Sequence, residues 1–216
     1  MAASNKVLKS NVFGSGPVRY QVPPEGGTLF IQIDYADAPV PSNYYVADHF
    51  YVENLGFRVQ IVFGKLTEDG KKLRSKLEIY VSALSFLRTV FGTTPKFHQA
   101  LKEEALARNF PEIAEGSREI EADKVQTVQA NNLLMASMDG ESMIDFFYIS
   151  PRDVHYKVPK REDIPIEALV RVMIDPPMML AVLNRWEAIA TELSKRFPKG
   201  EDYEYDQDKM ESDKTL

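Results

Sequence analysis

The chain has 216 residues, enough for one large domain or two small ones, and it contains no cysteine. Disulfide bonds and thiolate chemistry are therefore excluded. A net charge of −6 argues against general affinity for nucleic acid or for an anionic membrane surface. The amino-terminal stretch lacks the apolar core of a signal peptide, and no apolar run approaches the roughly 20 residues that span a bilayer. We therefore expect a cytoplasmic protein.

The first predicted elements are an irregular arm and a strand. Residues 1–27 are polar and rich in glycine and proline, and Val12 and Phe13 are expected to pin this arm to the body. Apolar residues alternate over 28–35, which predicts a strand. Residues 43–53 are rich in aromatic and β-branched side chains, and 57–63 alternate again after a turn at 54–56. This pattern predicts a hairpin.

Two helices are predicted after the next strand, which covers residues 76–81. The first helix runs over 83–91 and stops at Gly92. The second begins at Thr94 and Pro95, where a capping residue precedes a proline, and it ends near Asn109. A charged connection over 110–123 then leads into the second half of the chain.

The second half ends in the strongest helix signal of the sequence. Residues 124–138 are extended, a turn is expected at Asp139 and Gly140, and 142–149 form the returning strand. A loop with three prolines covers 150–166, and 168–174 alternate as a strand. Asp175 then caps a helix that begins at Pro176 and carries one apolar stripe to Phe197. Residues 199–216 read as a disordered acidic tail.

The two halves follow the same order of elements, which predicts an internal duplication. The best match sets 78–91 against 171–184 and pairs Ser82 with Asp175 as helix caps. We predict an α+β protein with two βββα-like repeats, at 28–110 and 111–198, an antiparallel sheet, and helices packed on one side.

The second repeat resembles the carboxyl end of a small bacterial and archaeal βββα domain family of unknown function. The matching features are Ala130-Asn131, the hairpin to Tyr148, Asp175-Pro176, Trp186 and Phe197. Ser42-Asn43 and Phe63-Gly64 echo the pattern in the first half. The layout is also similar to that of SecB-like export chaperones. These resemblances imply a fold and no reaction.

Few residues point to catalysis. His49 is expected to be a satisfied, partly exposed strand residue, and His98 and His155 are expected to be solvated on a helix and in a charged loop. Alternation along a strand places His49 and its neighbour Asp48 on opposite faces, so the two are not expected to pair. A hydrolase or metal-dependent site would have to combine His49 with Asp34 and Asp37. No catalytic residue, cofactor or metal site is predicted.

An apolar surplus is the better functional signal. One strand and the last helix carry more apolar residues than a single buried face requires, among them Tyr44, Tyr45, Phe50, Tyr51, Met178 and Val182. They either pack against the sister repeat or contact a partner protein. The leading hypothesis is a non-enzymatic, chaperone-like binding or assembly protein that forms a homo-oligomer. A structural subunit of a phage or secretion assembly, or the hydrolase above, are the alternatives.

Overall fold

The computed structural model describes residues 12–13, 39–68, 70, 72–115, 125–138, 140–157 and 165–197. The predicted strand at 28–35, most of the predicted arm and the predicted acidic tail lie outside these residues. The elements in chain order are β1 (Val12–Phe13), β2 (Tyr44–Val46), β3 (His49–Asn54), β4 (Arg58–Leu66), β5 (Leu73–Ser82), α1 (Ala83–Arg88), η1 (Thr89–Thr93), α2 (Pro95–Arg108), β6 (Gln126–Ala130), β7 (Asn132–Met138), β8 (Glu141–Ile149), α3 (Pro151–Lys157), β9 (Ile166–Ile174) and α4 (Pro176–Ser194). The predicted α+β class is confirmed.

The strands form two sheets, so the single shared sheet of the sequence prediction is not observed. One sheet has five strands in the order β1-β7-β8-β9-β2, and the other has four in the order β3-β4-β5-β6. Most neighbours are antiparallel, but β2 pairs with β9 and β6 pairs with β5 in parallel. Each parallel strand comes from the opposite half of the chain, so the halves exchange their first strands.

Two bends produce this exchange. The segments 43–53 and 124–138, each predicted as one extended strand, break at Asp48 and at Asn131 and pass from one sheet to the other. Asp48 accepts a hydrogen bond from the backbone N–H of Leu66 (3.2 Å), and Asn131 accepts one from that of Ile149 (2.8 Å). At each bend the neighbouring strand leaves the sheet, and a side-chain oxygen of the bend residue accepts the hydrogen bond of a backbone N–H that the strand no longer pairs with.

The ladders within the two sheets have matching registers. In the four-stranded sheet the register of β4 against β5 shifts between Phe63 and Gly64. In the five-stranded sheet that of β8 against β9 shifts between Phe146 and Phe147. A Cβ on Gly64 would collide with the backbone carbonyl of Arg74. The similarity fits the predicted order of elements, and common descent of the two halves stays a prediction.

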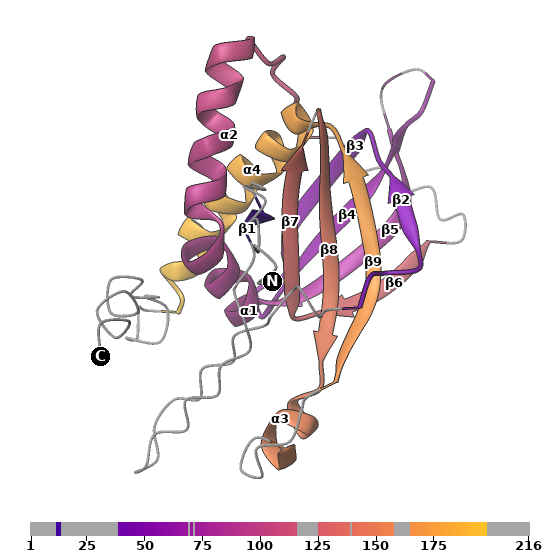
Figure 1. The fold of residues 1–216 in the computed structure, drawn as a ribbon, viewed down its shortest axis with the longest axis vertical. Helices are drawn as coiled ribbons and strands as arrows, with labels where there is room; N and C mark the ends of the chain where they lie inside the picture. Colours follow the sequence, from indigo (N-terminus) through magenta and orange to yellow (C-terminus); the bar gives the residue numbers. More distant parts are fainter. Residues whose placement is uncertain are drawn as a thin grey trace, which may run out of the picture.

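The helices gather beside the sheets. Figure 1 shows α1, α2 and α4 on the same side of the strands, with α3 at the far lower end. Asp175 caps α4 by accepting from the N–H of Met178 (2.8 Å), as predicted, and Ser82 caps α1 in the same way. The predicted stripe of α4 is buried, and Trp186 meets Phe86 of α1 edge-on with ring centroids 5.7 Å apart.

Two local predictions need correction. The helix expected over 83–91 is α1 followed by the π-helical turn η1, because the chain loosens its hydrogen-bonding pattern before Pro95. The predicted proline-containing loop at 150–166 includes the short helix α3. Residues of both sheets and of helices α1, α2 and α4 belong to one hydrophobic core. The core therefore joins the two predicted repeats.

Candidate functional site

Three of the six residues predicted to contact a partner are core residues. Phe50, Met178 and Val182 are 1%, 1% and 0% exposed. Met178 and Val182 are buried because α4 is covered on two sides, by the sheets and by the other helices, and Phe50 of β3 belongs to the same core. Tyr45 and Tyr51 are half-buried. Tyr44 alone is well exposed, at 70%.

The predicted acid–base residues are brought together only in part. Asp34 and Asp37 lie outside the described residues, so the hydrolase hypothesis stays untested. The Nδ1 atom of His49 lies 3.5 Å from a carboxylate oxygen of Asp48, although the angles are not those of a hydrogen bond. Alternation does not separate these neighbours because Asp48 stands at the bend. Among the described residues, no group of three acidic, histidine or cysteine side chains is placed to hold a metal.

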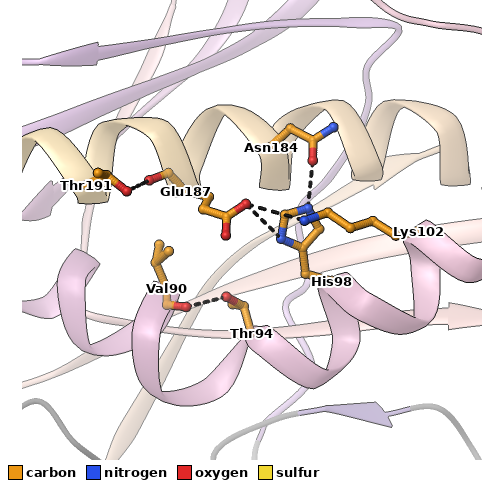
Figure 2. A network of polar contacts seen from close by, with 7 residues as sticks. All are labelled: Val90, Thr94, His98, Lys102, Asn184, Glu187 and Thr191. Atoms are coloured by element: carbon orange, nitrogen blue, oxygen red, sulfur yellow. Dashed lines mark hydrogen bonds and ion pairs between the residues drawn. The ribbon is translucent and has the colours of Figure 1, made fainter.

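His98 is buried, which corrects the prediction of a solvated helix residue. It is 6% exposed because α2 packs on α4 at this point. Figure 2 shows its ring between two side chains of α4. The Nε2 atom is 2.7 Å from Oδ1 of Asn184, and Nδ1 is 3.7 Å from a carboxylate oxygen of Glu187. Burial lowers the pKa of His98 below 6.5 and outweighs the hydrogen bond to Asn184, which acts to raise it.

A hollow of about 240 Å³ adjoins this histidine. Residues of η1, α2 and α4 line it, including Phe91, Thr94, Lys102 and Glu187. Lys102 approaches the same Glu187 oxygen that faces the ring (3.4 Å). The Nε2 atom of His98 is thus bonded to Asn184, whereas Nδ1 faces Glu187 at a distance longer than a hydrogen bond. The cluster links α2 to α4.

The outer face of the five-stranded sheet is the second distinctive surface. Met135, Ile144 and Val172 are each 0% exposed on its inner face. Their strand neighbours therefore point outward. These neighbours pair across β7, β8, β9 and β2 into one row, which we call the apolar row: Ala136, Met143, Met173 and Val46. Val46 is 61% exposed, and the other three are half-buried.

The corresponding row of the four-stranded sheet is polar. It lies at the same distance from the register shift and consists of Glu53, Gln60, Tyr80 and Gln129. The amide of Gln60 donates to the hydroxyl of Tyr80 (2.9 Å) and to the carboxylate of Glu78 (3.1 Å). In this row the four-stranded sheet thus presents hydrogen-bonded polar side chains outward, and the five-stranded sheet presents alanine, methionine and valine. Exposed apolar groups in a contiguous row are typical of contact surfaces.

An ion pair borders the apolar row. Arg171 of β9 donates two hydrogen bonds to Asp145 of β8, each 2.7 Å long, and this pairing raises the pKa of Arg171. The side chain of Asp145 is 3% exposed. In the ladder, Arg171 stands opposite Tyr44, whose side chain is exposed. The ion pair links β8 to β9, next to the exposed Tyr44 on β2.

Strand β2 forms an open edge of the same sheet. The carbonyl of Asn43 accepts from the N–H of Arg171 (2.9 Å), and the N–H of Ala47 donates to the carbonyl of Met173 (3.1 Å). In a parallel ladder alternate residues bond to one neighbour, so the N–H and C=O groups of Tyr44 and Val46 point away from β9. Such groups are a template for another strand.

At strand β3, which is the edge of the other sheet, side chains bond to outward-pointing backbone groups. The N–H of Val52 donates to the carboxylate of Glu115 (2.7 Å). Arg185 of α4 forms an ion pair with that carboxylate and approaches the carbonyl of Val52 (3.4 Å). Side chains thus occupy the outward-pointing donor and acceptor of Val52, in the middle of this edge.

No family model, curated protein or solved structure matches the chain. Among the helices that the structure describes, none is both long enough and apolar enough to cross a membrane. The apolar row was missed in the sequence because its four members come from four strands. The alternation of residues 142–149 and 168–174 could be recognised in the sequence. Which strands lie next to them in the sheet could not.

Proposed function

We propose that the chain is a non-enzymatic protein-binding and assembly protein, and that it contacts its partner through the apolar row and the open edge of β2. The contrast between two corresponding rows supports this most directly, because the outward row that contains Gln60 is polar in the four-stranded sheet and the row that contains Met143 is apolar in the five-stranded sheet. The partner would be a polypeptide in extended conformation, since β2 offers backbone groups next to apolar side chains.

The proposed contact has the composition of an adaptable surface. Met143 and Met173 are flexible side chains that fit varied apolar partners. Each 100 Å² of apolar surface that a partner covers contributes about 2.5 kcal/mol before the costs of ordering. Tyr44 adds an aromatic ring beside the row, and aromatic residues are enriched at the centres of interfaces. A chaperone-like role and a role in a larger assembly would both use this surface.

The test is binding to a panel of fluorescent eight-residue peptides that alternate apolar and polar side chains, measured by fluorescence anisotropy. We expect the wild-type chain to bind the more apolar members. Met173→Lys places a charge in the apolar row and is expected to weaken binding at least tenfold. Leu106→Lys is the matched control, because Leu106 is 82% exposed and belongs to the helix α2. Equal losses in both variants, or no binding by the wild type, would reject the proposal.

A further inference from the structure

We infer that the partner on the edge of β2 is a second copy of this chain, joined around a two-fold axis that passes beside Tyr45. This inference rests on the proposed function, because it names the partner of the same surface. It arises from the spacing of the outward-pointing backbone groups, which belong to Tyr44 and Val46, one residue on each side of Tyr45.

The edge is complementary to itself. When two antiparallel strands meet, a hydrogen-bonded residue pair exchanges both of its N–H···O=C bonds. A two-fold axis beside Tyr45 sets Tyr44 of one copy opposite Val46 of the other, and the reverse. All four outward N–H and C=O groups of each copy then find partners in the same four groups of the other copy. No other residues are needed to satisfy the edge.

The surroundings permit this approach. Ser42, Asn43, Tyr44 and Val46 are all exposed, so the edge is accessible over this stretch. The edge strand carries no charged side chain, although charged residues are a common means of blocking such pairing. The β3 edge, by contrast, is occupied by Glu115 and Arg185. The molecule thus protects one edge with charged side chains and leaves this one open.

The dimer would occupy the edge of β2 and widen the sheet that carries the apolar rows. Joining two five-stranded sheets through β2 gives one continuous sheet of twice the width. Val46, the last residue of the apolar row, would stand beside Tyr44 of the second copy. The apolar row of each copy would then continue across the axis into Tyr44 and the Arg171–Asp145 pair of the other copy. An isologous contact of this kind closes on itself, so it produces a dimer and no fibre.

The absence of cysteine gives a register-specific test. In the proposed dimer the two Tyr45 residues form a non-hydrogen-bonded pair with Cα atoms about 4.5 Å apart. A disulfide spans that distance. The two Tyr44 residues, like the two Val46 residues, are diagonal neighbours at about 7–8 Å, which is too far. Under mild oxidation Tyr45→Cys should therefore give a covalent dimer, whereas Tyr44→Cys and Val46→Cys should each remain monomeric chains.

A mixture of Tyr44→Cys and Val46→Cys should give the mixed dimer, and Leu106→Cys is the control for random collisions. A second measurement tests the dimer even if the Tyr45→Cys variant does not fold. Val46→Pro removes only an outward N–H, so sedimentation equilibrium should show dimerisation weakened at least tenfold relative to the wild type. Cross-linking at all positions alike, or a wild type that stays monomeric to its solubility limit, would overturn the dimer. Peptide binding by such a monomer would leave the proposed function standing.

Discussion

The ion pair between Arg171 and Asp145 allows a direct test of what stabilises the five-stranded sheet. Arg171→Met removes the cation and leaves the Asp145 carboxylate, 3% exposed, without its two 2.7 Å hydrogen bonds. Breaking a buried pair from one side costs about 3–5 kcal/mol. For a chain of this length the melting temperature should fall by about 6–20 °C.

The double variant Asp145→Val with Arg171→Met should restore most of this loss. Valine is a suitable replacement because Val62, at the corresponding position of the other sheet, is 0% exposed. Replacing both partners of a buried ion pair with apolar residues is often neutral or stabilising. The double variant is therefore expected within about 1–2 kcal/mol of the wild type.

Urea titrations followed by circular dichroism at neutral pH measure all four members of this double-mutant cycle. Strong coupling between the two substitutions is the expected result. Two outcomes would refute the reasoning. One is an Arg171→Met variant that loses less than about 1 kcal/mol, as an exposed pair would. The other is a double variant whose loss equals the sum of the single losses.

Three further changes test other parts of the fold. Folding lowers the pKa of His98, so the unfolded chain binds more protons, and the free energy of unfolding should fall as the pH drops below 6.5. His98→Gln should reduce this pH dependence in urea titrations. An unaltered pH dependence would contradict the prediction. Gly64→Ala should cost about 1–3 kcal/mol in thermal melts because its Cβ meets the Arg74 carbonyl, and an unchanged melting temperature would disprove the clash. Asn131→Ala should cost about 1–3 kcal/mol and more than Asp48→Ala, whose bond is solvent-exposed; equal losses would argue against a special role for the buried bend.

Local signals were sufficient to predict most of the individual elements, but not the short helix α3 or the bends that divide two of the strands. Asp175 and Pro176 mark the start of α4 because capping and a missing N–H act within a few residues. The turn before Gly140, whose φ is 89°, follows from the conformational freedom of glycine. The apolar stripe of α4 was predicted from its period, and its members are buried.

The pairing of strands that lie far apart in the chain could not be predicted from the sequence. The bends at Asp48 and Asn131 interrupt segments that read as continuous strands, and which sheet each part joins depends on partners far along the chain. The burial of His98 likewise depends on Asn184, which lies on another helix. The excess of apolar residues was noticed, but its core and surface members could be separated only once the sheets were assembled. Tyr44 lies on the surface and Phe50 in the core.

Methionine oxidation tests the central claim most directly. Met143 and Met173 are half-buried on the outer face, whereas Met135, Met178 and Met179 are at most 1% exposed. Treatment with dilute hydrogen peroxide and mass spectrometry should show Met143 and Met173 oxidising before Met135, Met178 and Met179, and a bound apolar peptide should slow both. Oxidation of this pair at the same rate with saturating peptide would contradict the assignment of this face as the binding surface.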